Sequence, residues 1–126
     1  VAIAATALFF YAVLSEAVVE ARRLDSPHGL AFALVHLAHT RLDLDPKADV
    51  RVELAEADDV ARTVQNPRCQ AWAAWGRARA AQAAGAGAVA IAEGRRAAEL
   101  LADGEFPWAR EQLAEFRARI AGTRTT

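Results

Sequence analysis

The sequence predicts an all-α fold in which antiparallel helix pairs stack on one another. Pro27, Pro67 and Pro107 recur at intervals of forty residues, and a fixed period in this range is typical of stacked-repeat architectures. Alanine, the strongest helix former, is abundant. Tyr and β-branched residues, which strands favour, are few after the first stretch. Apolar residues recur at the three- and four-residue spacing of a helix face.

The forty-residue period extends beyond the prolines. Residues 21–38 align with residues 61–78, so that Phe32 corresponds to Trp72. The third copy keeps the proline but has Gln112 at the aromatic position. A single helix pair cannot bury its apolar face alone, so we expect three stacked pairs to form one continuous core.

Proline and glycine mark the expected ends of the helices. Proline fits the first helical position, and Ser26, Asp45 and Asn66 each stand before a proline as candidate N-caps. Phe106 stands before the third proline and is expected to pack over the turn. The predicted helices span residues 1–24, 27–42, 46–64, 67–84, 88–102 and 107–121. Gly122 is expected to end the last helix, leaving one domain at residues 1–122 and a polar tail at 123–126.

The first predicted helix carries no charge over residues 1–14. One alternative is a membrane span, but this run covers only about 21 Å of a hydrocarbon core of about 30 Å. A signal peptide would begin with basic residues, which are absent. We therefore expect no membrane role, and a helix buried on most sides whose outer partner lies in missing sequence or in a second subunit. The chain starts at Val1 and contains no Met, which predicts a piece of a longer protein.

The net charge and the cysteine content bear on possible binding partners and on the cellular compartment. The net charge of −1 creates no global field that would attract nucleic acid or an anionic membrane. We therefore expect no direct contact with nucleic acid. Cys69 is the only cysteine, so no internal disulfide can form, which suits a cytoplasmic protein.

No catalytic motif is evident. The glycine-rich turn after the fourth predicted helix lacks the Lys and Ser or Thr of a phosphate loop. His36 and His39 could share a helix face, but a metal site needs a third ligand. Cys69 lies near a helix N-terminus that could lower its pKa, yet no base is close in sequence. The acidic residues around Asp58 are expected to be solvated. We expect no enzyme activity, no metal and no cofactor; the alternative is a helical enzyme or metal protein that uses His36 and His39.

The fourth predicted helix carries Trp72, Trp75 and Gly76 in the order W-x2-W-G. This resembles the first helix of a tetratricopeptide repeat, whose pattern is W-x2-L-G-x2-Y. Arg79 stands at the position of the Tyr, and the period of forty is longer than usual. The resemblance implies a tetratricopeptide-like α-solenoid, in which the Trp fills the space between two helices and the Gly allows them to approach closely.

Two longer segments, residues 21–38 and 99–122, resemble the repeat region of large bacterial ATP-dependent transcriptional regulators with a LuxR-type DNA-binding domain. In those proteins, a run similar to residues 106–110 often closes the repeat array. The resemblance implies a non-enzymatic sensor or interaction region of a cytoplasmic bacterial regulator. The alternative is a freestanding helical scaffold or oligomerisation domain, which could form a homo-oligomer through its apolar first helix.

In the tetratricopeptide family, ligands lie along the first helix of each pair. The resemblance therefore implies a groove that includes Thr40, Gln70, Arg77, Arg110 and Arg117. Such a groove would be basic at its C-terminal end and would suit a protein, an acidic peptide or a small anionic ligand. The alternative is that these arginines are solvated, or that they pair with the acidic third helix.

Overall fold

The computed structural model describes the backbone of residues 2–102 and 107–125, and the side chains of residues 4–102 and 111–122. Within these residues the chain forms six α-helices and no strand, which confirms the all-α prediction. The helices are α1 (Ala2–Arg23), α2 (Pro27–Leu44), α3 (Arg51–Thr63), α4 (Pro67–Ala83), α5 (Gly87–Leu101) and α6 (Pro107–Thr125).

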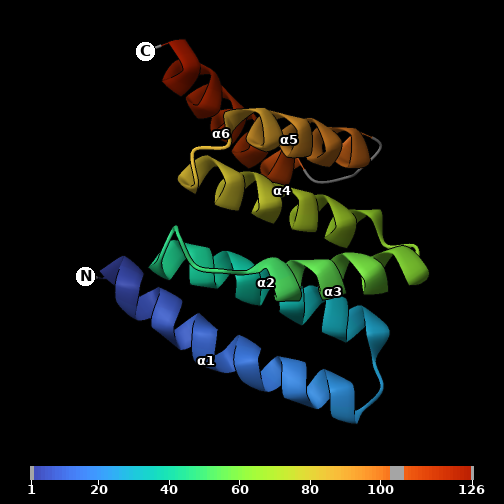
Figure 1. Ribbon diagram of the computed structural model, residues 1–126. Helices are drawn as coiled ribbons and strands as arrows, with labels where there is room; N and C mark the ends of the chain where they lie inside the picture. Colours follow the sequence, from blue (N-terminus) through green and yellow to red (C-terminus); the bar gives the residue numbers. More distant parts are fainter. Residues whose placement is uncertain (1, 103–106, 126) are drawn as a thin grey trace.

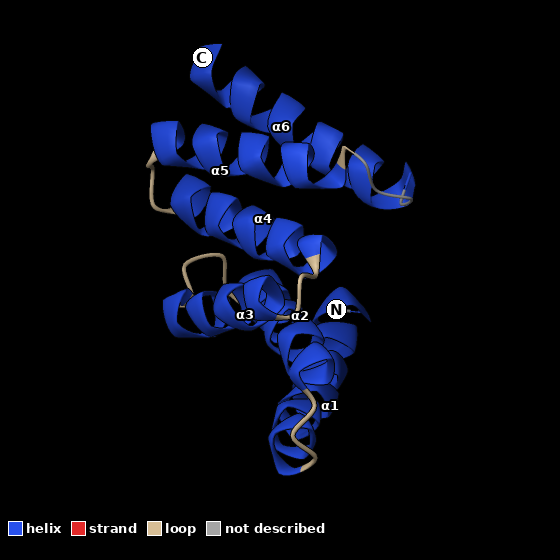
Figure 2. Cartoon of the chain, turned by 90° about the vertical axis from the view of Figure 1, so that its right-hand side faces the viewer, coloured by secondary structure: helices blue, strands red, loops and turns tan. Residues whose placement is uncertain are grey.

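The helices are stacked in chain order, and successive helices run in alternating directions (Figure 1). Each helix packs against the next one along the chain, and α2 also contacts α4. The view from the side shows α5 and α6 above α4, with α1 at the opposite end of the stack (Figure 2). The contact between α2 and α4 matters for the site, because it brings together two helices that occupy the same place in successive copies of the forty-residue repeat.

The forty-residue repeat is also present in the backbone of the turns. Asp25 and Gln65 adopt the left-handed conformation, with φ of 52° and 55°, and Gly85 does so with φ of 78°. Each of these residues terminates a helix, a position where the left-handed conformation lets the last carbonyls find donors. Ser26 and Asn66 follow directly, and their side chains accept hydrogen bonds from the N–H groups of the next helix. The two caps confirm the predicted starts of α2 and α4.

The predicted start of the third helix is wrong, because α3 begins at Arg51 and not at Pro46. Asp45 does not cap a helix N-terminus; it is the C-terminal cap of α2. Its Oδ1 accepts a hydrogen bond from the N–H of Lys47 at 3.0 Å and thereby closes a turn. The N-cap position of α3 is Val50, which makes no side-chain capping bond; Asp49, one residue before it, accepts from the N–H of Arg51 through its Oδ1 at 3.2 Å.

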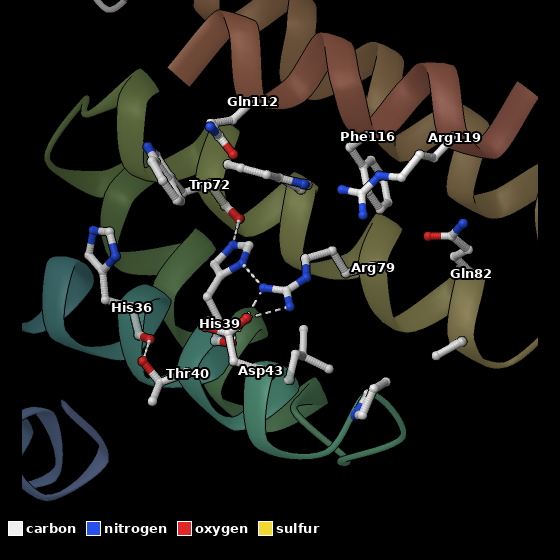
Figure 3. Close-up of a pocket in the computed structure, with 14 residues that line it drawn as sticks. His36, His39, Thr40, Asp43, Trp72, Arg79, Gln82, Gln112, Phe116 and Arg119 are labelled. Carbon is white, nitrogen blue, oxygen red and sulfur yellow. Dashed lines mark hydrogen bonds and ion pairs between the residues drawn. The ribbon is translucent and has the colours of Figure 1, made fainter. Parts of the chain in front are cut away.

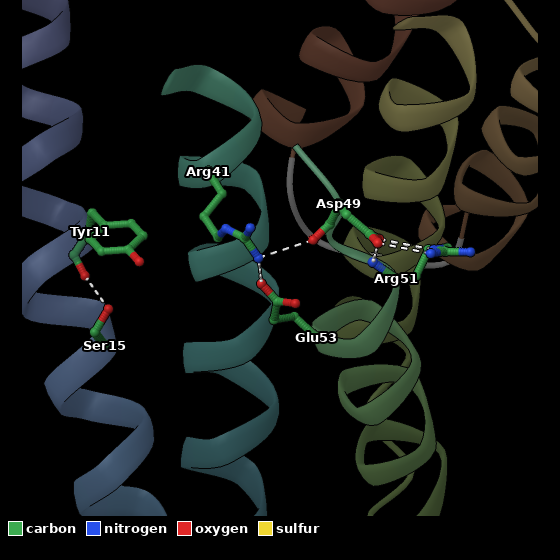
Figure 4. Close-up of polar contacts among 6 residues, drawn as sticks. All are labelled: Tyr11, Ser15, Arg41, Asp49, Arg51 and Glu53. Carbon is green, nitrogen blue, oxygen red and sulfur yellow. Dashed lines mark hydrogen bonds and ion pairs between the residues drawn. The ribbon is translucent and has the colours of Figure 1, made fainter. Parts of the chain in front are cut away.

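Arg41 holds this turn against α2 (Figure 4). Its Nη1 donates to the carbonyl oxygen of Asp49 at 3.1 Å and forms an ion pair with Glu53. The Asp-Pro pair therefore opens a compact turn that an arginine of α2 fastens, a contact between segments that local sequence does not reveal.

The predicted end of the last helix is also wrong, since α6 continues through Gly122 to Thr125. Gly122 is exposed, and a Cβ added to it would meet no atom within 4 Å. Glycine inside a helix costs only about 1 kcal/mol relative to alanine, which is not enough to end it. Phe106, expected to pack over the preceding turn, lies outside the described residues.

The core consists mainly of small side chains from the predicted apolar faces. On α3, the buried residues Leu54, Ala57 and Ala61 follow Val50, which is also buried. On α6, Leu113, Phe116 and Ile120 follow the same three- and four-residue spacing and are also buried. Alanines therefore allow the helices to pack closely along most of the stack.

Within the described residues, α1 is exposed on most sides, and its burial by a partner outside this chain stays a prediction. Ala7 and Ala21 are buried, whereas Leu8, Phe9 and Val19 are between 58% and 66% exposed. The reason is that α2 packs against only one face of α1. By length and composition, Ala4–Arg23 could cross a membrane, with mean hydropathy 1.5, a property shared by some core helices and signal sequences.

Gly76 on α4 lies where α3 and α2 approach α4 most closely. A Cβ at this position would lie 2.8 Å from Cδ2 of Leu54 and 3.4 Å from Nε2 of His39. Leu54 is only 2% exposed and His39 is 6% exposed, so neither side chain has free space to move into. The glycine of the W-x2-W-G run is therefore required by packing.

Gly76→Ala should lower the free energy of unfolding by about 1–2 kcal/mol, because overpacking outweighs the gain in helix propensity. Gly94→Ala on α5 is the matched control, since a Cβ there would meet only Cγ of Arg117 at an ordinary 3.7 Å. That control should raise the free energy of unfolding by about 0.5–1 kcal/mol. Urea unfolding followed by circular dichroism measures both. Equal stabilisation by the two substitutions would contradict the packing argument.

Candidate functional site

A groove of about 760 Å³ lies between α2, α4 and α6, the helices that begin at the three prolines of the forty-residue repeat. The side chains labelled in Figure 3 come from these three helices and face one another across the opening. Aromatic rings, amides and charged groups share the surface. The lining residues include His36, His39, Thr40, Asp43, Trp72, Trp75, Arg79, Gln112, Phe116 and Arg119.

His39 lies at the base of the groove and joins α2 to α4. Its Nε2 lies 2.9 Å from the carbonyl oxygen of Trp72, and its Nδ1 lies 2.9 Å from Nη1 of Arg79. A guanidinium only donates, so Nδ1 accepts and Nε2–H donates to the carbonyl, which fixes a neutral tautomer. Burial lowers the pKa of His39 to about 3, and the charge of Arg79 acts in the same direction. His39 is therefore an uncharged link between two helices at neutral pH.

Arg79 is held in the groove from two sides. Its Nη1 donates to His39, and its Nη2 donates to Oδ1 of Asp43 at 2.6 Å. The Arg79 side chain is 25% exposed and the Asp43 side chain is 51% exposed, so the ion pair faces the opening of the groove. The guanidinium is thus positioned by a buried partner, and its acidic partner remains in contact with solvent.

The aromatic rings form a continuous row across the groove. The ring centroids of Trp72 and Trp75 are 4.9 Å apart, and His36 lies 5.0 Å from Trp72. On the far side, Phe116 lies 6.4 Å from Trp75. The row begins at the exposed Phe32, 4.4 Å from His36, and therefore spans α2, α4 and α6. Rings at these distances and tilts attract one another and form a rigid surface.

One polar atom of the groove lacks a partner. Nε1 of Trp75 is buried and has no hydrogen bond within the described residues. A buried tryptophan N–H usually finds an acceptor. Because Trp75 lines the groove, its wall contains a buried donor without an acceptor among the described residues.

The groove residues follow the forty-residue repeat, in a position that sequence reasoning missed. His39, Arg79 and Arg119 lie forty residues apart and all line the groove. The predicted position, at Arg77 and Arg117, lies two residues earlier in each copy, which is about 200° around the helix axis. His39 and Arg79 occupy the same position of the repeat and are both polar, and this correspondence in the sequence could have indicated the groove position.

Of the four predicted groove residues whose side chains the structure describes, only Thr40 lines this groove. Its hydroxyl donates to the carbonyl of His36 at 2.8 Å. Arg77 instead faces α3 and α5, where it lies 3.3 Å from Asp58 and 3.9 Å from Glu93. This arrangement corresponds to the alternative in which the arginine pairs with the acidic third helix.

The other three predicted residues are separated from the groove or are not described. Gln70 is half-buried in the first turn of α4 and does not line it. Arg117 is exposed and borders shallow hollows between α5 and α6. The side chain of Arg110 lies outside the described residues. The structure therefore does not bring the predicted set together.

The residues considered for metal binding or nucleophilic chemistry have other roles. Both ring nitrogens of His39 are occupied by hydrogen bonds. Among the described residues, no group of three or more His, Cys, Asp or Glu side chains is placed to hold a metal ion. Cys69 is buried, and burial raises the pKa of its thiol, contrary to the expected effect of the helix N-terminus. A thiol with a raised pKa is a poor nucleophile at neutral pH.

The expectation that the acidic residues of α3 are simply solvated is wrong for Asp58. This side chain is only 4% exposed and lies close to Arg62, Arg77 and Arg96. It therefore belongs to the contacts that join α3, α4 and α5, and not to the groove.

The groove is thus an open, rigid surface that combines aromatic rings with fixed charges, and it is suited to binding. Comparison of the chain with known protein families, with curated proteins and with solved structures finds no match.

Proposed function

We propose that this chain is a non-enzymatic interaction module that binds a ligand or a segment of a partner in the groove between α2, α4 and α6. The observation that carries the proposal is the arrangement of Arg79, held by His39 and Asp43, beside a row of aromatic rings. A concave surface with many apolar walls and a few fixed polar groups is typical of binding sites. The groove's volume of about 760 Å³ also lies in the usual range for such sites.

The resemblance to tetratricopeptide repeats supports the same groove, because in that family the first helices of the pairs carry the ligand. The resemblance to bacterial LuxR-type regulators extends the proposal to a cytoplasmic sensor region that passes a binding signal to other domains. The occupant would be a protein segment, an acidic peptide or a small anionic ligand, since arginines from α4 and α6 line the groove.

A panel of acidic peptides, aromatic carboxylates and neutral small molecules, screened by thermal shift, tests the proposal. We expect at least one anionic compound to raise the melting temperature, because a ligand that binds only the folded state stabilises it. Arg119→Glu should abolish this shift, since Arg119 lines the groove. Arg117→Glu on the same helix is the matched control and should keep it. A panel with no stabilising compound, or loss of the shift only in Arg117→Glu, would contradict the proposal.

A second candidate is a homo-oligomer formed through α1. The observation that favours it is the row of exposed apolar side chains at Leu8, Phe9, Phe10 and Val13, because exposed apolar patches often mark interaction surfaces. Phe9→Glu with Val13→Glu should then shift the mass measured by light scattering from a dimer to a monomer. A wild-type chain that is strictly monomeric would remove this candidate.

A further inference from the structure

We propose that the preferred occupant of the groove is a planar aromatic anion, a small molecule with a flat ring system and one carboxylate or a similar acidic group. This inference rests on the proposed function and specifies the chemistry of its ligand. Three features of the groove lead to it: the sign of its charge, the geometry of its rings and its supply of hydrogen-bond donors.

The charged groups that line the groove sum to a positive value. Among the lining side chains that the structure describes, Arg79 and Arg119 are cationic and Asp43 is the one acidic residue. His36 and His39 add no charge at neutral pH, because burial lowers the pKa of both. The groove therefore attracts an anion, although the whole chain carries a net charge of −1.

Asp43 already shows how a carboxylate binds in this groove. Its Oδ1 accepts from Nη2 of Arg79 at 2.6 Å, while its side chain remains 51% exposed. His39 holds the other terminal nitrogen of Arg79, so the guanidinium stays in place when a carboxylate approaches. A ligand carboxylate would compete with, or add to, this exposed internal carboxylate.

The ring system of the ligand is inferred from the aromatic row beside Arg79. His36, Trp72 and Trp75 follow one another at centroid distances of 5.0 and 4.9 Å, and their planes are tilted by 52° and 42°. Such a surface offers both ring faces and ring edges to a flat ligand. A flexible aliphatic chain would gain apolar contact but no ring stacking.

In the part of the chain that the structure describes, the groove wall contains one donor without an acceptor, together with two guanidinium groups. Nε1–H of Trp75 has no partner within the described residues. The guanidinium groups of Arg79 and Arg119 can only donate. A carboxylate offers two charged oxygens that accept several hydrogen bonds, whereas the amide of a neutral analogue offers one uncharged acceptor oxygen.

Isothermal titration calorimetry with 2-naphthoate tests the inference directly. We expect the full chain to bind 2-naphthoate at least about tenfold more tightly than 2-naphthamide, which lacks the charge. The same margin is expected over decahydro-2-naphthoate, which lacks the flat rings. Equal binding of the acid and the amide, or of the aromatic and the saturated acid, would overturn the proposal.

Two substitutions test the role of the ion pair. Arg79→Gln should weaken 2-naphthoate binding about tenfold or more. Asp43→Asn should strengthen it severalfold, because it removes the competing carboxylate and the one negative charge of the groove lining. A gain in affinity cannot arise from misfolding, so unchanged or weaker binding by Asp43→Asn would overturn the proposal. Arg117→Gln, outside the groove, should bind as the wild type does.

The outcomes also separate this inference from the proposed function. If 2-naphthoate does not bind while another compound of the thermal-shift panel binds and depends on Arg119, the ligand class is wrong and the binding groove stands. If no compound of the panel binds in this way, both are wrong.

Discussion

Asp58→Asn is expected to lower the free energy of unfolding by about 3 kcal/mol, although it removes no more than one charge. Removing one partner of a buried ion pair costs about 3–5 kcal/mol, because the remaining charge is left without compensation. The lower end of this range applies, since Arg62 and Arg96 are 58% and 40% exposed and can turn toward water. Arg77 is only 29% exposed and has less room to turn toward water, but it keeps Glu93, 3.9 Å away, as an acidic partner.

The geometry explains why this one carboxylate matters. Asp58 on α3 is 4% exposed, and its Oδ2 lies 2.5 Å from Nη2 of Arg62 and 3.3 Å from Nη2 of Arg77. Arg96 of α5 reaches to within 3.8 Å of Oδ1. Three consecutive helices therefore meet at a single side chain. Each of the arginines would repel the others if the negative charge were removed.

Asp59→Asn is the matched control for this prediction. Asp59 is the next residue and lies 3.6 Å from the same Arg62, but its side chain is 77% exposed. Exposed ion pairs contribute little, so the control should change the free energy of unfolding by less than about 0.5 kcal/mol. Urea unfolding of both variants, followed by circular dichroism, makes the comparison. Similar losses in the two variants would show that Asp58 is not the centre of these contacts.

The fold could be predicted largely because helix starts and apolar faces are local signals. Ser26 and Asn66 cap the helices they precede, and the apolar face of α3 is buried as its spacing indicates. Asp45 carried the same local signal as these caps, yet it closes a turn. The difference arises from Arg41 of α2, which fastens the residues after Pro46 through contacts with Asp49 and Glu53. Contacts of this kind depend on tertiary packing.

The groove was harder to predict, because its position depends on how the helices are rotated about their axes. Arg77 and Arg79 are separated by two residues, and sequence spacing alone does not show which of them faces α2 and α6. The structure places Arg79 beside His39 and Arg77 beside Asp58. A forty-residue comparison that paired His39 with Arg79 would have identified the groove position, since both residues are polar and arginine follows at position 119.

Lowering the pH from about 7 to about 5 is expected to reduce the free energy of unfolding by about 2 kcal/mol through His39 alone. The pKa of His39 is about 3 in the folded chain, compared with 6.5 for an unperturbed histidine. The unfolded chain therefore binds a proton below about pH 6.5 that the folded chain does not bind. Stability is consequently fully present above this pH and is lost progressively toward pH 3. His36, whose pKa is also lowered by burial, contributes with the same sign.

His39→Gln isolates this effect, because a glutamine amide can also donate to the carbonyl of Trp72 and accept from Arg79 without titrating. Urea unfolding at several pH values should show a shallower pH dependence in this variant than in the wild type, by about 1.4 kcal/mol per pH unit below pH 6. Asp49 and Glu56 do not interfere, since their arginine partners lower their pKa values and keep them ionised above pH 5. Parallel slopes in wild type and His39→Gln would mean that His39 accepts a proton in the folded chain, and that the link between α2 and α4 is not the neutral one described here.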